Sequence, residues 1–277
     1  MTVALVTGCS SGIGRATALA LVRTGVTTVA TARRVEQLDE LAAAGCVVLP
    51  LDVTDDASRR ACVDAAAELA GPVDVLVNNA GYAEMGPVEQ VPLDAWRTQL
   101  ETNVLGPVAL VQLLLPGMRD RGRGRIVNVS SMGGEITFPG GGAYHASKHA
   151  LEAVSDALRV EAAPFGVLVS VVQPGPVATR FDVNAADLSV YSSGPYAALV
   201  ASLDEQIRTR TPRGSAPQSV AEVVVRAATA RRPRTRYRVG ALARGLVLGR
   251  RVVPDRGWDA AMRLAFRPRP SAAAPAA

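Results

Sequence analysis

The chain has 277 residues, of which 48% are hydrophobic and 20% charged, and its formal net charge is +5. This length and apolar fraction allow a large core and exclude a disordered chain. Three cysteines without metal-binding spacing favour a reduced, cytoplasmic protein. The first residues lack the basic segment of a signal peptide. The longest apolar stretch, 104–118, contains Gly106, Pro107 and Pro116 and is too short to span a bilayer, so we expect no stable membrane insertion.

Short apolar runs alternate with segments of helical spacing along most of the chain. We expect strands at 3–7, 26–32, 46–51, 73–77, 125–130, 167–173 and 235–239, and helices at 14–24, 35–44, 55–70, 93–121, 143–164 and 220–232. The strands are continuously apolar, which is typical of a parallel sheet buried on both faces. The predicted fold class is therefore α/β, a single doubly wound Rossmann domain with a parallel sheet of about seven strands and helices on both faces.

The predicted organisation is a Rossmann domain over residues 1–240, a C-terminal extension packed on it over 241–266, and a disordered tail over 267–277. Helical periodicity weakens between 181 and 217, where Pro, Gly and Ser separate apolar and aromatic residues. Because this segment follows a strand at the ligand-binding edge of the sheet, we expect a lid over the substrate. The alternative is a set of short helices packed on the sheet edge or on a second subunit.

A glycine-rich turn follows the first predicted strand, with the sequence Thr-Gly-Cys-Ser-Ser-Gly-Ile-Gly over residues 7–14. Glycines at such a turn let the backbone approach a pyrophosphate, and the N-terminus of the next helix supplies N–H donors. The turn predicts a dinucleotide site, with contacts from Gly8, Ser10, Ser11, Gly12, Ile13 and Gly14.

The end of the second predicted strand indicates which dinucleotide binds. It reads Thr-Ala-Arg-Arg over residues 31–34, with no acidic residue before Glu36. An NAD enzyme usually has an acidic side chain here for the ribose 2′-hydroxyl, whereas a guanidinium binds a 2′-phosphate. Arg33 and Arg34 therefore predict NADP(H), the alternative being ordinary polar residues at a surface turn. Arginines also crowd residues 231–251, where we expect a solvated surface and no nucleic-acid partner, since no nucleic-acid motif accompanies them.

The only lysine of the chain, Lys148, follows Tyr144 by four residues on a predicted helix. Residues at this spacing share a helix face, so the ammonium would favour the phenolate. Lowering the pKa of a tyrosine by about three units takes roughly 4 kcal/mol. Tyr144 would then serve as an acid or base near neutral pH. The pair alone also fits a half-buried tyrosine beside a surface lysine.

Taken with further motifs in order, the sequence resembles the short-chain dehydrogenase/reductase family over residues 3–179. The motifs are Asp52-Val53, Asn78-Asn79-Ala80-Gly81, Asn103 in Glu-Thr-Asn-Val, Ser131 placed 13 residues before Tyr144, and Pro174-Gly175 with Thr179. The resemblance implies a catalytic set of Asn103, Ser131, Tyr144 and Lys148. It also implies cofactor contacts from Asp52, Val53, Asn79, Ala80, Gly81, Tyr144, Lys148, Pro174, Gly175, Val177 and Thr179.

The function implied by this resemblance is an NADP(H)-dependent oxidoreductase that interconverts a secondary alcohol and a ketone. Details of the glycine-rich turn and of the C-terminal part resemble the branch of 17β-hydroxysteroid and retinol dehydrogenases, which implies an apolar small-molecule substrate and a homodimer or homotetramer. The alternatives are a redox-neutral epimerase or isomerase that retains its cofactor, and a non-catalytic NADP sensor. His145 and His149 share a helix face without an accompanying carboxylate, and we expect no metal.

Overall fold

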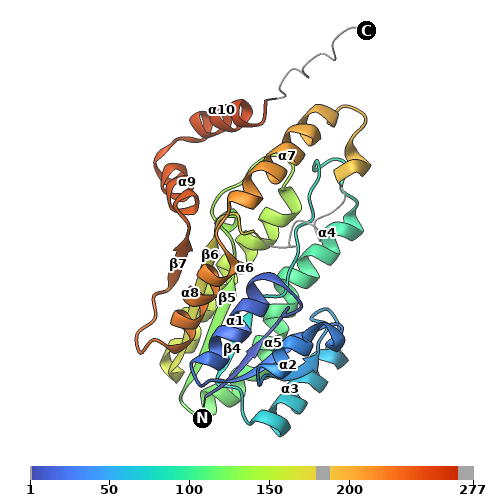
Figure 1. The fold of residues 1–277 in the computed structure, drawn as a ribbon. Coiled ribbons are helices and arrows are strands. Elements are labelled where there is room, and N and C mark those ends of the chain that lie inside the picture. Colours follow the sequence, from blue (N-terminus) through green and yellow to red (C-terminus); the bar gives the residue numbers. More distant parts are fainter. Residues whose placement is uncertain (1, 179–187, 268–277) are drawn as a thin grey trace.

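The computed structural model describes residues 2–178 and 188–267. Its centre is a parallel sheet (Figure 1), whose strands lie in the order β3-β2-β1-β4-β5-β6-β7. The strands are β1 (Val3–Val6), β2 (Thr27–Ala32), β3 (Val47–Pro50), β4 (Val75–Asn78), β5 (Gly124–Val129), β6 (Val167–Pro174) and β7 (Arg236–Val239). The doubly wound Rossmann fold predicted from the sequence is confirmed, with β7 at the sheet edge.

Helices cover both faces of the sheet and one of its ends. They are α1 (Gly12–Arg23), α2 (Asp39–Ala43), α3 (Asp56–Ala70), α4 (Leu93–Leu100), α5 (Gly106–Asp120), α6 (Gly142–Ala162), α7 (Ala197–Arg210), α8 (Pro217–Thr229), α9 (Ala241–Val252) and α10 (Asp255–Ala265). The core contacts place α1, α2 and α8 on one face and α3, α5 and α6 on the other. Helices α7, α9 and α10 lie beyond the carboxyl ends of the strands (Figure 1).

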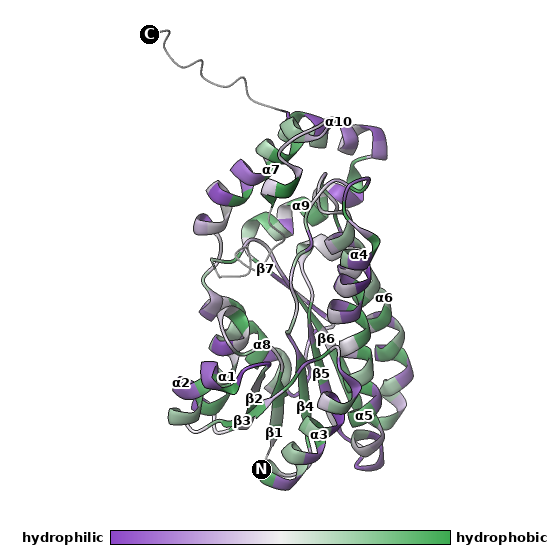
Figure 2. Ribbon diagram, turned by 90° about the vertical axis from the view of Figure 1, so that its right-hand side faces the viewer, coloured by the Kyte–Doolittle hydropathy of each residue, from purple (hydrophilic) through white to green (hydrophobic). Residues whose placement is uncertain are grey.

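Burial on both faces explains why the strands lack polar alternation. In β1, Ala4 and Val6 contact the cluster under α1 and α8, whereas Val3 and Leu5 contact the cluster under α3 and α5. Leu5 is fully buried, and such a side chain contributes about 1.5–3 kcal/mol to folding. The apolar strands accordingly form the middle layer between helices that are more polar on their outer sides (Figure 2).

Two predicted helices differ from expectation in the structure. The segment predicted at 35–44 is a 3-10 turn (η1, Val35–Leu38) followed by the short α2, with Leu38 and Leu41 both fully buried. The segment predicted at 93–121 is divided by a π-helical turn (η2, Glu101–Leu105) between α4 and α5. Such turns insert a residue into the helical register, and they are frequent at functional sites.

The segment expected to be a lid contains more regular structure than its sequence suggested. Part of it, 181–187, lies outside the described residues, and the rest forms a 3-10 turn (η6, Leu188–Tyr191), α7 and a second 3-10 turn (η7, Thr211–Arg213). Helix α7 buries Val200 and Leu203. These two residues stand at i and i+3, a helical spacing that the surrounding Gly, Pro and Ser obscured in the sequence.

Length and composition alone would let one helix of the described chain, Leu93–Asp120, cross a membrane. Its most apolar window is 39% buried in the fold. Leu110, Leu114 and Met118 pack from this helix against the sheet, and this packing accounts for its apolar character.

Candidate active site

The predicted cofactor residues meet at the carboxyl ends of β1, β2 and β4. The hydroxyl of Thr7 accepts hydrogen bonds from the backbone N–H groups of Asn79 and Ala80, each at 2.9 Å, and the Asn79 side chain donates to Thr7 O at 2.8 Å. These bonds hold the glycine-rich turn against the end of β4. The Asn-Asn-Ala-Gly segment therefore supports the turn through its two middle residues, Asn79 and Ala80.

Gly8 and Gly14 of the turn have no room for side chains, because each packs directly against neighbouring protein atoms. Gly8 has a φ of +72°, and a Cβ on Gly14 would lie only 2.2 Å from Gly8 O. Helix α1 begins at Gly12, so the N–H groups of its first turn face this space. A glycine turn packed this closely at the start of a helix fits a dinucleotide pyrophosphate at the helix N-terminus.

Charged side chains lie beside the glycine-rich turn, where the resemblance places the adenosine part of the cofactor. Arg33 and Arg34 are both exposed at the end of β2. Burial tends to raise the pKa of Asp52, but hydrogen bonds from Thr54 and the charges of Arg33 and Arg59 lower it below its usual value. Arg33 therefore lies within electrostatic reach of Asp52, where the resemblance places the adenine end of the cofactor.

Helix α6 carries Tyr144 and Lys148 one turn apart. The Lys148 ammonium lies 6.0 Å from the centroid of the Tyr144 ring and donates to Val129 O at 3.0 Å. Lys148 is only 5% exposed, and burial lowers its pKa to about 8 although the charge of Glu152 acts in the opposite direction. A cation held beside a half-buried phenol favours the phenolate.

Ser131 stands at the end of β5, where the chain turns into a 3-10 turn (η3, Met132–Gly134). Its hydroxyl oxygen accepts a hydrogen bond from Gly133 N at 3.0 Å. The serine is half-buried, and this hydrogen bond from the following turn orients its hydroxyl.

Asn103 lies within the π-helical turn η2 and is buried. Its side chain bonds both backbone groups of Tyr82, at 3.2 and 3.0 Å, and donates to Ser147 Oγ at 3.0 Å. A Cβ on Gly81 would lie 2.8 Å from Asn103 Oδ1 and 3.8 Å from Lys148 Nζ. Asn103, Gly81 and Lys148 are thus brought together, although their sequence separations are large.

The loop after β6 carries the residues predicted to contact nicotinamide. Gly175 N donates to Val239 O at 3.0 Å, and Val177 forms an isolated bridge with Ser215. Pro174 is buried at the end of β6, whereas Thr179 lies outside the described residues. The loop is therefore tied to both β7 and the segment before α8.

An apolar cluster borders Tyr144 on the side away from the sheet. Its buried members are Ala83, Met85, Leu203 and Phe266, and Phe138, Tyr144, Leu188, Leu199, Ile207 and Met262 pack against them. The Phe138 and Phe266 rings stack with their centroids 5.7 Å apart. Helices α7 and α10 thus contribute to the same apolar wall, and Gln206 of α7 donates to Ala265 O of α10 at 3.0 Å.

The comparison with known proteins decides the family. A family model described as short chain dehydrogenase matches residues 2–188. The chain belongs to the short-chain dehydrogenase family.

Relatives match along nearly the whole chain. The uncharacterized oxidoreductase YusZ of Bacillus subtilis is 36% identical over 275 residues, covering 94% of this chain and 97% of YusZ. A short-chain dehydrogenase structure from Streptomyces avermitilis is 36% identical, with a TM-score of 0.79 over 90% of this chain and 91% of the other. An alcohol dehydrogenase from Thermococcus sibiricus, solved with 5-hydroxy-NADP, is 26% identical with a TM-score of 0.70, covering 86% of this chain and 96% of the other. This short-chain dehydrogenase is thus an oxidoreductase by family.

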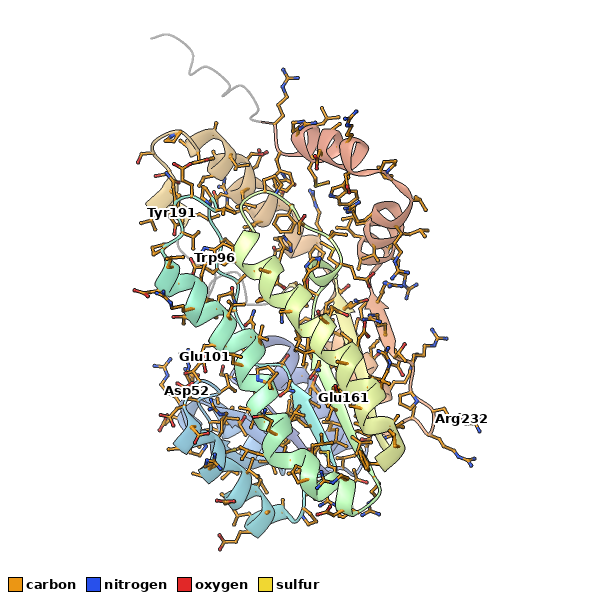
Figure 3. All side chains as sticks on the ribbon, turned by 180° about the vertical axis from the view of Figure 1, so that it is seen from behind. Asp52, Trp96, Glu101, Glu161, Tyr191 and Arg232 are labelled. Atoms are coloured by element: carbon orange, nitrogen blue, oxygen red, sulfur yellow. The ribbon has the colours of Figure 1, made fainter. Side chains whose placement is uncertain are left out.

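The sequence did not reveal how this short-chain dehydrogenase uses its late arginines. Arg236 of β7 donates to Glu152 at 3.0 Å and Asp156 at 2.6 Å, while Arg238 and Arg251 both donate to Glu135. These three arginines are therefore part of an ion-pair network beside α6. The expectation of a solvated arginine surface is wrong for Arg236 and Arg238, whereas the Arg251 side chain is 59% exposed. By contrast, Arg232 projects from the fold into solvent (Figure 3). The sequence shows the arginines and the carboxylates but not their pairing, because the partners are far apart in the chain.

His145 supports the same region through hydrogen bonds to the backbone. Its Nδ1 lies 3.0 Å from Gly133 O, and Phe138 N donates to its Nε2 at 3.4 Å, as a neutral ring protonated on Nδ1 allows. Burial lowers the pKa of His145 to about 4, so the ring is neutral at pH 7. Within the described part of the chain, no group of three His, Cys, Asp or Glu side chains is placed to hold a metal ion.

Proposed function

We propose that this short-chain dehydrogenase interconverts a secondary alcohol and a ketone on an apolar small molecule, with NADP(H) as its cofactor. The observation that carries the proposal is the placement of Lys148, a buried cation one helical turn from Tyr144 and beside Asn103. Burying an ammonium costs free energy, so the fold holds the cation there against its solvation. The burial of this cation is explained if its neighbour Tyr144 must release and regain a proton.

In this proposal the bound nicotinamide supplies or accepts the hydride. Ser131 and Tyr144 hydrogen-bond the substrate oxygen, and Tyr144 donates its phenolic proton to that oxygen during reduction. Lys148 stabilises the resulting phenolate and binds the nicotinamide ribose. Asn103, which is held by Tyr82 and Ser147, holds in this proposal a water molecule that joins Lys148 to solvent. The chain's own contribution is orientation and proton transfer.

The choice of NADP(H) over NAD(H) rests on the end of β2. Arg33 and Arg34 stand where an NAD enzyme would carry a carboxylate for the ribose 2′-hydroxyl. A guanidinium pairs with a phosphate through two charge-assisted hydrogen bonds, so either arginine suits a 2′-phosphate. The loop residue Ser10 adds a hydroxyl near the same place.

The substrate class follows from the wall around Tyr144. Phe138, Leu203, Phe266 and Met262 present aromatic and aliphatic surface beside the tyrosine. Pockets lined in this way bind apolar ligands and use a few polar groups for orientation. This wall supports the apolar substrate implied by the resemblance to hydroxysteroid and retinol dehydrogenases.

A panel of apolar ketones, assayed at 340 nm with NADPH and separately with NADH, tests the proposal. We expect reduction of at least one ketone, with a higher kcat/KM for NADPH than for NADH and one NADPH oxidised per alcohol formed. Product formation without net NADPH consumption would instead identify a redox-neutral isomerase. Tight NADPH binding with no turnover of any ketone or alcohol would identify a sensor.

A further inference from the structure

The turn that follows Ser131 is short and closed by its own backbone. Gly134 N donates to Ser131 O at 3.0 Å, and Glu135 N donates to Met132 O at 3.0 Å. The hydroxyl of Ser131 also accepts from Gly133 N. Residues 131–135, which we call the serine turn, therefore behave as one unit, and displacing Glu135 at its end displaces Ser131 at its start.

The carboxylate of Glu135 is held from three directions. Gln173 of β6 and Arg238 of β7 donate to its Oε1, each at 2.7 Å, and Arg251 of α9 donates to its Oε2 at 2.8 Å. The side chain is 16% exposed. Burial tends to raise the pKa of Glu135, but these hydrogen bonds lower it below its usual value, so the group is a carboxylate at neutral pH. Charge-assisted hydrogen bonds of this kind are short and directional.

Gln173 extends the contact toward the lysine of the site. Its amide group donates to Glu135 and also to Glu152 Oε1 at 2.9 Å. Glu152 is one turn beyond Lys148 on α6, and its charge acts on that lysine. The serine turn and the Tyr144–Lys148 helix are therefore joined through one buried amide.

Apolar contacts hold the serine turn on the same side. Ile136, which follows the turn, lies in a buried cluster with Val247 of α9 and Trp258 of α10, and Met132 packs against this cluster. The C-terminal helices thus contact the turn through both an ion pair and a packed core. Such a combination restricts a loop more than either contact alone, because each limits the movements that the other permits.

We propose that Glu135 is a positioning residue for Ser131, and that helix α9 takes part in this positioning through Arg251. The inference rests on the proposed function, since it gives Ser131 the task of binding the substrate oxygen. The C-terminal extension is then a working part of the active site, although it supplies none of the groups that touch the carbonyl.

The experiment compares Glu135→Gln, Arg251→Leu and Arg251→Lys with a matched control, Arg256→Leu, which removes an exposed arginine from α10. Hydrogen–deuterium exchange of the NADPH-free protein, read on peptides covering 131–141, reports the order of the serine turn without any substrate. Steady-state kinetics with a ketone from the panel give kcat and KM, and fluorescence titration gives the Kd for NADPH.

For Glu135→Gln and Arg251→Leu we expect faster exchange at 131–141 and a fall in kcat of about 10- to 100-fold, the range associated with small misplacements of a reacting group. The Kd for NADPH should stay within about twofold of wild type, because the glycine-rich turn is untouched. Arg251→Lys, which retains the charge, should recover most of the kcat, and Arg256→Leu should match wild type in both readouts.

Unchanged exchange at 131–141 in Arg251→Leu would overturn the inference. A loss of kcat accompanied by an equal loss of NADPH affinity and by failure of Arg251→Lys to recover would also overturn it, because that pattern marks general destabilisation. If the wild type reduces no ketone, the proposed function fails separately, and the exchange measurement still decides whether Glu135 and Arg251 order the serine turn.

Discussion

The hydroxyl of Tyr144 is the group on which the proposed chemistry depends most directly. We expect Tyr144→Phe to lower kcat by about 10²- to 10⁴-fold, the usual contribution of a general acid, while the Kd for NADPH changes little. Tyr237→Phe is the matched control, because Tyr237 on β7 loses only a hydrogen bond from Arg234 N. Stopped-flow or steady-state assays with one ketone measure both variants, and more than about a tenth of wild-type kcat in Tyr144→Phe would contradict the assignment.

Lys148 sets the pH range over which the tyrosine is assisted. Burial lowers the pKa of Lys148 to about 8, so the side chain is charged below that pH and neutral above it. The charged form stabilises the phenolate, and we therefore expect kcat/KM for ketone reduction to fall as pH rises through about 8. His145, whose pKa is about 4, does not titrate in this range. A profile that is flat from pH 7 to pH 9.5 would contradict this role for Lys148.

Arg33 determines the predicted cofactor preference. We expect Arg33→Asp to raise KM for NADPH by about 10- to 100-fold, since charge-assisted hydrogen bonds to the 2′-phosphate are lost and a carboxylate repels it. NADH should be used as well as before or better. Arg232→Asp, at a position that projects into solvent (Figure 3), controls for the change in net charge. A wild type that uses NADH as well as NADPH would contradict the interpretation of Arg33.

At the scale of elements, α10 is expected to influence substrate binding through Phe266. This side chain is 8% exposed and stacks on Phe138 within the cluster that borders Tyr144. We expect Phe266→Ala to raise KM for an apolar ketone by about 10-fold, near the lower end of the range for lost apolar pocket contacts, with a smaller change in kcat. Leu264→Ala, two residues away and 73% exposed, should leave KM unchanged. Equal KM values for the two variants would exclude α10 from the substrate wall.

Sequence patterns located the strands within one or two residues, because parallel strands buried on both faces are short apolar runs bounded by polar or glycine residues. The π-helical turn around Asn103 could not be predicted, since it changes the hydrogen-bond register without changing the apolar composition. Helix α7 was hidden because Gly, Pro and Ser stand on both sides of it and few of its own residues are apolar and buried.

Some residues of the candidate site could be predicted from the sequence and others could not. Thr7, Tyr144 and Lys148 could be predicted as site residues because they belong to motifs whose members lie close together in the sequence. Glu135 does not, because its partners Gln173, Arg238 and Arg251 lie 38, 103 and 116 residues away in the chain. Contacts of that range are set by the packing of β6, β7 and α9, which no local pattern records.

At the scale of the whole molecule, exposed apolar side chains support self-association. Leu93 and Leu105 are 69% and 50% exposed at the two ends of the α4–η2 segment, and such surfaces often mark subunit contacts. We expect light scattering after size exclusion to give two or four times the chain mass of 28.8 kDa. Leu105→Glu should lower the mass toward one chain, whereas Leu69→Glu on α3 should not. A monomeric wild type would contradict the prediction.

The order in which the chain is synthesised gives the Glu135 contacts one more consequence. Residues 2–178 contain the glycine-rich turn, Arg33, Ser131, Tyr144 and Lys148, whereas Arg238, Arg251 and Trp258 leave the ribosome later. A domain generally folds as a unit, and α1 packs on α8, so the nucleotide cradle can form only after residue 229 has emerged. A chain that ends before α9 would keep the cradle and α8 but lack Arg251 and Trp258, and we expect it to bind the nucleotide while reducing a ketone more slowly than the chain of 277 residues.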